Sequence, residues 1–191
     1  LRKEAIDGDF LERFFGGASD SGNLYRAVRP EDDFRSGNLV YYGPDPETYV
    51  PYYSKRTNEE ENDYSDIVEL CRIFDPVETP DGEFAGRLEE VADVEQWARF
   101  FAVHNVLANE DGGIQNRVGE DYFLYRVPET SGRSDAGKWV LAPWDVEESF
   151  GNSTEKLFTS QVQAVRRFLQ HPRFAPMYYD ALDVLRKGAF A

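Results

Sequence analysis

The feature that most constrains the fold is a hairpin pattern in the second half of the chain. Two apolar runs, 122–125 and 139–142, read as strands, and residues 131–137 form the tip between them. One acid, Asp111, stands before the first strand, and another, Asp145, follows the second. Because a hairpin brings its ends together, the sequence predicts that these two carboxylates are neighbours at one mouth.

The other elements follow from hydrophobic spacing and from Gly and Pro breaks. Helices are predicted at 6–15 with Asp7 or Asp9 as N-cap, from Asn62 or Asp63 to 74, and at 93–107, 154–169 and 175–187. Strands are predicted at 23–28 and 39–42, while 43–62 is predicted as loop-rich and 75–86 as a connection. No repeat and no break in composition divides the chain. We therefore expect one α+β domain spanning residues 1–191.

Charge narrows the class of partner. The formal net charge is −15, from 36 acidic against 21 basic residues. An acidic surface repels a phosphate backbone, so nucleic acid is not expected as a partner. A basic protein partner, or cations, would suit this surface.

The remaining composition excludes several other classes. The single cysteine, Cys71, lies in an apolar run and is predicted to be a core residue, as is His104. One cysteine and two histidines disfavour a zinc site. No stretch approaches the roughly 18 apolar residues of a membrane span. The chain opens at Leu1 without a start methionine, so it is expected to be cut from something longer.

The acids near the hairpin have both a chemical and a structural interpretation. Asp145 follows a buried strand, where a carboxylate is costly without a partner or a metal, although it could instead cap a helix. Asn116 comes five residues after Asp111, and Asp121 opens the first strand, so either could supply a second oxygen ligand. Residues 109–113 could equally form an ordinary turn. Protein kinases have the same local order, with a catalytic acid, a hairpin and a metal-holding acid.

The chain resembles the CotH kinase family, which is named from spore coat assembly. The resemblance rests on a series of blocks in family order rather than on any single motif. The blocks are Glu4-Ala5-Ile6-Asp7, Phe10-Leu11, Phe15-Gly16, Gly22-Asn23-Leu24-Tyr25-Arg26, 53–63, Asp66-Ile67, Asn109-Glu110-Asp111, Tyr122-Phe123-Leu124-Tyr125-Arg126, Pro143-Trp144-Asp145 and Ser149-Phe150-Gly151.

The resemblance implies an atypical protein kinase, secreted or located at a cell or spore surface, that uses ATP and Mg²⁺ or Mn²⁺. It would phosphorylate Ser or Thr of a protein partner, and the acidic surface favours a basic, Ser-rich substrate. The implied fold is kinase-like and consists mostly of the C-terminal-lobe portion, with the N-terminal lobe expected upstream of Leu1.

Residue roles carry over by matching the blocks. Asp111 matches the catalytic acid and Asp145 the metal-binding acid, with Asn116 or Asp121 assisting a second ion. The predicted phosphate-binding residues are Lys55 and Arg26.

This sequence departs from the family pattern at three positions. Arg26 replaces a common lysine, Asp121 a common asparagine, and Glu147 a common second aspartate. These departures leave room for a CotH-like adhesion or coat-assembly module that has lost transfer activity. A structural calcium site around Asp111 in a secreted scaffold is a third possibility.

Overall fold

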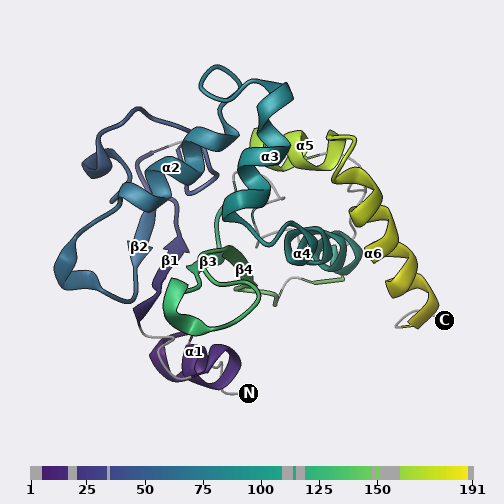
Figure 1. The fold of residues 1–191 in the computed structure, drawn as a ribbon, viewed down its shortest axis with the longest axis horizontal. Coiled ribbons are helices and arrows are strands. Elements are labelled where there is room, and N and C mark those ends of the chain that lie inside the picture. The colour runs from purple at the N-terminus through teal and green to yellow at the C-terminus, as the bar shows by residue number, and fades with distance from the viewer. Residues whose placement is uncertain are drawn as a thin grey trace.

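A small antiparallel sheet organises the protein. The computed structural model describes residues 6–16, 21–33, 35–108, 114, 119–147, 149–150 and 160–188. Within these ranges the strands lie in the order β2-β1-β3-β4, and every neighbouring pair is antiparallel (Figure 1). The strands are β1 (Asn23–Ala27), β2 (Tyr53–Lys55), β3 (Tyr122–Arg126) and β4 (Trp139–Pro143).

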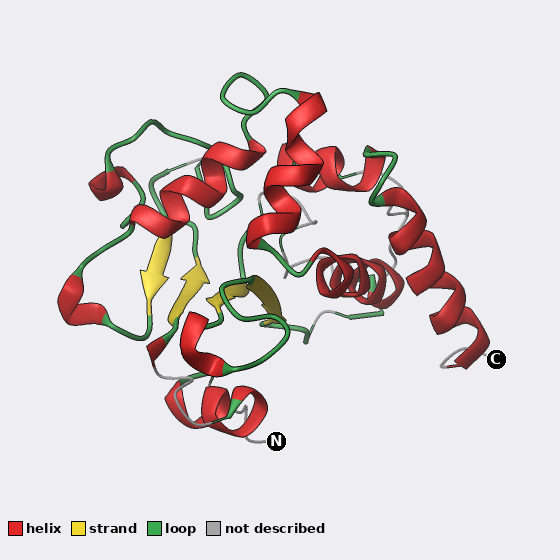
Figure 2. Ribbon diagram, viewed as in Figure 1, coloured by secondary structure: helices red, strands yellow, loops and turns green. Residues whose placement is uncertain are grey.

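Helices cover both faces of this sheet (Figure 2). The described helices are α1 (Gly8–Phe15), α2 (Ser65–Phe74), α3 (Asp81–Val91), α4 (Val94–Leu107), α5 (Gln163–Gln170) and α6 (Ala175–Gly188), with short 3-10 turns η2 (Pro46–Thr48), η3 (Glu59–Glu61) and η4 (Glu129–Ser131). None of the described helices is long and apolar enough to span a bilayer. The protein is therefore a mixed α+β structure, as its sequence predicts.

The alternation of side chains along the strands separates two apolar clusters. Leu24 of β1 lies across from Tyr125 of β3, and this face packs against Leu11 of α1. The neighbouring pair, Tyr25 and Leu124, faces the larger core that α2 to α6 cover. Helix α1 thus lies on the opposite side of the sheet from the other helices.

The structure differs from the predicted elements between residues 39 and 62. Residues 39–42 do not form a strand, because tyrosine hydroxyls replace a strand partner: the Leu39 amide donates to Tyr53 Oη (2.9 Å) and the Tyr42 amide to Tyr49 Oη (2.8 Å). Instead β2, inside the segment predicted as loop, completes the sheet.

The predicted connection 75–86 is also wrong, because α3 already begins at Asp81. Pro80 stands just before the helix, where its missing N–H costs nothing, and acids in the first turn suit the positive end of the helix dipole. Of the predicted helix 154–169, α5 accounts only for the part from Gln163, and residues 154–159 lie outside the described ranges.

The hairpin and the long helix before it are confirmed, and Asp7 is the N-cap of α1. Cys71 and His104 are both buried, as predicted. Burial raises the pKa of the Cys71 thiol to about 12, which keeps it protonated and unreactive at neutral pH.

Acid should destabilise the protein through His104. Burial lowers the pKa of His104 in α4 to about 4, against an ordinary value of 6.5. The neutral imidazole therefore contributes stability above pH 6.5, and this contribution, on the order of 3 kcal/mol, is lost as the pH falls towards 4.

Urea unfolding at a series of pH values tests this expectation. Between pH 6.5 and 4, the wild type should lose more free energy of unfolding than His104→Gln, which cannot take up the proton. Burial lowers the pKa of His171 as well, but that side chain is less buried, so His171→Gln is the control. Its loss of free energy of unfolding between pH 6.5 and 4 should differ less from that of the wild type. Parallel pH curves for wild type and His104→Gln would contradict the prediction.

Candidate functional site

The open end of the hairpin carries two acids. Tyr122 of β3 pairs with Pro143 of β4 at the open end of the hairpin. Asp121 comes just before Tyr122, and Asp145 follows Pro143 by two residues. Both acids have left-handed backbone angles, with φ of 54° at Asp121 and 50° at Asp145. Aspartate adopts this conformation more readily than most residues, and the bend takes both acids out of their strands at the same end of the sheet.

Arg26 completes this acidic end. It lies on β1 opposite Phe123, and its Nη2 donates to Asp121 Oδ1 at 2.8 Å. Its guanidinium also lies over the ring of Trp144, 5.3 Å from the ring centre. The predicted phosphate-binding cation and a predicted metal ligand therefore bind each other in this structure, and both side chains are partly exposed (30% and 23%).

Lys55, the other predicted phosphate-binding residue, does not lie with Arg26. Lys55 lies on β2 and pairs with Tyr25 of β1, so it faces the opposite side of the sheet from Arg26, and only 6% of it is exposed. Its Nζ donates to the backbone oxygen of Asp63 (2.9 Å) and lies 5.8 and 6.0 Å from the ring centres of Tyr25 and Tyr64. These contacts join β2 to the segment that leads into α2.

Asp111 and Asn116 lie outside the described residues, but the structure describes where their segment begins. Helix α4 ends at Leu107, and the Leu107 carbonyl accepts a hydrogen bond from the Phe150 amide at 2.6 Å. The segment after Asp145 therefore contacts the end of the helix that leads to Asp111.

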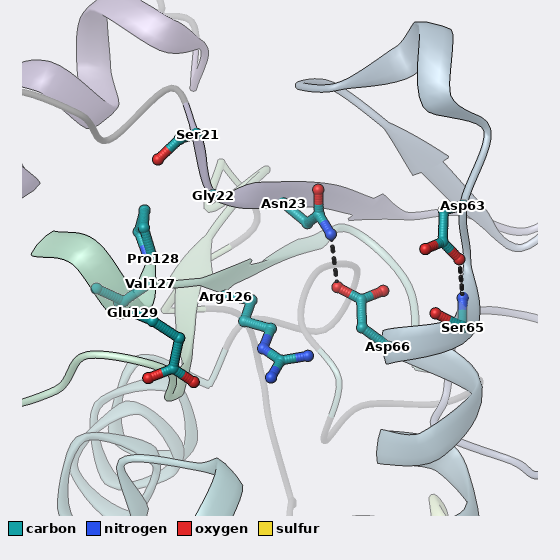
Figure 3. Close-up of a pocket in the computed structure, with 10 residues that line it drawn as sticks. All are labelled: Ser21, Gly22, Asn23, Asp63, Ser65, Asp66, Arg126, Val127, Pro128 and Glu129. Carbon is teal, nitrogen blue, oxygen red and sulfur yellow. Dashed lines mark hydrogen bonds between the residues drawn. The ribbon is translucent and has the colours of Figure 1, made fainter.

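A separate polar cavity of about 250 Å³ opens at the other end of the sheet, where Asn23 pairs with Arg126 (Figure 3). Asn23 Nδ2 and Tyr25 Oη both donate to the carboxylate of Asp66, each at 2.7 Å. Burial, with Asp66 beside it, raises the pKa of Tyr25 well above its usual range, so this hydroxyl remains a donor. These bonds tie β1 to the first turn of α2.

Hydrogen bonds join residues 57–58 to residues 22–24 at this end of the sheet. Thr57 Oγ1 donates to the Gly22 carbonyl (2.6 Å) and accepts from the Leu24 amide (2.9 Å), and Asn58 Nδ2 donates to Asn23 Oδ1 (3.0 Å). Only glycine fits at position 22, because a Cβ there would lie 2.5 Å from the Arg126 carbonyl oxygen. Sequence reasoning missed this network, although clustered Thr, Asn and Asp within the blocks are a signal for it.

The acids at the hairpin's open end have suitable chemistry for a hard cation. Carboxylate oxygens are the ligands that Mg²⁺ prefers, and such sites commonly use one or two carboxylates together with substrate phosphates and water. Within the described ranges, no group of three or more His, Cys, Asp or Glu side chains gathers as a closed metal site.

The fold and the site define a mixed α+β protein with an acidic candidate site at the open end of a hairpin. Over residues 1–191, the chain matches the family model described as CotH kinase protein. It therefore belongs to the CotH kinase family. No curated protein and no solved structure matches it.

Proposed function

We propose that this protein is an ATP- and divalent-metal-dependent protein kinase that phosphorylates Ser or Thr of a protein partner. Family membership points to a kinase. The observation that carries the assignment is the bond between Leu107 and Phe150. It joins the end of the helix before Asp111 to the segment after Asp145, which supports the proposal that both acids serve one site.

In this proposal Asp111 and Asp145 have different roles. Asp111 orients the acceptor hydroxyl and takes its proton while the hydroxyl oxygen forms a bond to the γ-phosphorus. The bond from the γ-phosphorus to the bridging oxygen breaks, and ADP leaves with that electron pair. Asp145 would hold the metal, with Asn116 or Asp121 assisting a second ion. Bound there, Mg²⁺ or Mn²⁺ would neutralise charge on the phosphate oxygens.

We assign phosphate neutralisation to Arg26 rather than to Lys55. Arg26 lies at the same end of the hairpin as both described acids, whereas Lys55 is buried on the other face with its ammonium bonded to Asp63. On this proposal, Arg26 and Asp121 exchange their mutual ion pair for contacts with phosphate and metal. A guanidinium suits this role because its fork of donors matches phosphate oxygens.

Charge and family support the class of partner and its location. The net charge of −15 favours a basic acceptor protein, since opposite charges speed encounter and suppress acidic competitors. Membership of a spore coat family supports action at a surface. We therefore propose a basic, Ser-rich surface protein as the substrate.

Intact mass spectrometry tests the proposal directly. The protein is incubated with ATP, Mn²⁺ and a basic Ser-rich peptide, and the masses of both polypeptides are measured. We expect phosphate on the peptide or the protein only when ATP and metal are both present. A nucleotide adduct would contradict phosphate transfer. Unchanged masses, together with no heat of ATP binding in calorimetry, would contradict the kinase and favour an adhesion module.

A further inference from the structure

Gln96 of α4 pairs with the free edge of the sheet. In the described part of the chain, β4 is an outer strand, so the outward amide and carbonyl of Leu141 have no strand partner. Gln96 Nε2 donates to the Leu141 carbonyl (2.8 Å), and Gln96 Oε1 accepts from the Leu141 amide (3.0 Å). The carboxamide thus substitutes for the peptide unit of a further strand, satisfying both groups at once.

Further hydrogen bonds connect α4 to β4 and to the segment that follows it. At the start of β4, Trp97 Nε1 and the Asp93 amide both donate to the Trp139 carbonyl, at 2.9 and 3.1 Å. Past its end, the Leu107–Phe150 bond joins the same two segments again. The first turn of α4 is therefore bonded to β4, and the last residue of α4 is bonded to the segment that follows β4. Both bonds at Trp139 go to a single carbonyl. Gln96 instead bonds both the amide and the carbonyl of Leu141, so it sets the register of α4 along β4.

We propose that Gln96 is a positioning residue that sets where the Asp145 turn lies relative to the end of α4. Asp145 follows Leu141 by four residues, and Asp111 follows the end of α4 by four. A slip between helix and strand would therefore move the Asp145 turn relative to Leu107, where the segment that leads to Asp111 begins. This inference rests on the proposed kinase function for its catalytic consequence. Small misplacements of reacting groups can cost about 100-fold in rate.

Gln96→Glu tests the pairing through pH. A carboxylate has no donor for the Leu141 carbonyl and repels it, whereas a protonated carboxylic acid has one donor and one acceptor, like the amide. We expect kcat at pH 7.5 to fall at least about 10-fold with little change in KM for ATP, because the Asp145 turn moves relative to the end of α4 while the residues proposed to bind ATP stay together on the sheet. The ratio of variant to wild-type kcat should recover as the pH is lowered.

Two further variants separate positioning from simple loss of structure. Gln96→Met fills the same space without hydrogen bonds, so its kcat should fall without recovering at low pH. Gln170→Glu, at the exposed end of α5, is the matched charge control and should follow the wild type at every pH. Wild-type kcat in Gln96→Met, or the same pH profile for both Gln96 variants, would overturn the proposal.

Tryptophan fluorescence gives a readout that does not need catalysis. The three tryptophans of the chain are Trp97 on α4, Trp139 on β4 and Trp144 next to Asp145. Gln96→Glu should shift their emission at pH 7.5 and restore it at low pH. If wild type transfers no phosphate, the kinase assignment fails, while this shift still decides the role of Gln96. Emission identical to wild type at both pH values would overturn that role.

Discussion

Replacing Asp145 by asparagine should reduce metal-dependent phosphate transfer roughly 100- to 1,000-fold. A metal ion contributes several kcal/mol to stabilising the transferring phosphoryl group, and each 1.4 kcal/mol or so is a tenfold change in rate. The amide keeps the shape of the side chain but loses the negative charge that would hold the metal. Labelled phosphate from γ-labelled ATP, counted on the acceptor in the presence of Mn²⁺, measures the loss.

The same variant should leave the fold almost unchanged. Asp145 has φ of 50°, and asparagine is at least as tolerant of that left-handed conformation as aspartate. We therefore expect the free energy of unfolding to change by less than about 1 kcal/mol. Asp180→Asn, on the exposed surface of α6, is the matched control and should keep full activity. Equal phosphate incorporation by Asp145→Asn and Asp180→Asn would contradict the role of Asp145.

Phe168→Ala should cause the largest loss of stability, about 3–5 kcal/mol. Phe168 of α5 is fully buried and stacks on Phe174 with ring centres 4.7 Å apart. It also meets Phe101 (5.3 Å) and Trp97 (6.4 Å) of α4. Truncation would remove the ring that joins α5 to α4 and leave a cavity between aromatic walls that cannot collapse freely.

Urea denaturation followed by circular dichroism measures this loss. The midpoint should fall while the slope stays constant, as for a change in stability alone. The free energy of unfolding of a typical domain is about 5–15 kcal/mol, so the variant would keep only part of its stability. Phe14→Ala removes the same ring from an exposed position on α1 and should cost far less. A similar midpoint for both variants would show that the α4–α5 core is not the dominant one.

Local patterns were enough to predict much of the fold. The hairpin at 122–143, helix α4 and the burial of Cys71 all follow from residues close together in the sequence, because apolar periodicity directly reports the face that each element buries. Helix α3 is not evident from local residue types, because Pro80 and Gly82 are typical of a connection, although proline is compatible with the start of a helix.

Long-range pairing accounts for the other differences. Residues 39–42 have the composition of a strand, but tyrosine hydroxyls take their amides. Lys55 and Arg26 are both cations in neighbouring blocks of the resemblance, yet the alternation of side chains along β1 and β2 puts them on opposite faces. Such outcomes depend on which strands meet, and no local window contains that information.

Residue types and their local spacing were enough to predict the family, helix α4 with the hairpin after it, and the acids proposed for the candidate site. Only the tertiary structure decided that Arg26 binds Asp121, 95 residues away, and that Gln96 pairs with Leu141. A guanidinium or a carboxamide can satisfy many partners equally well. Its partner is therefore chosen by the packing of the sheet and helices, which brings one candidate within hydrogen-bonding distance.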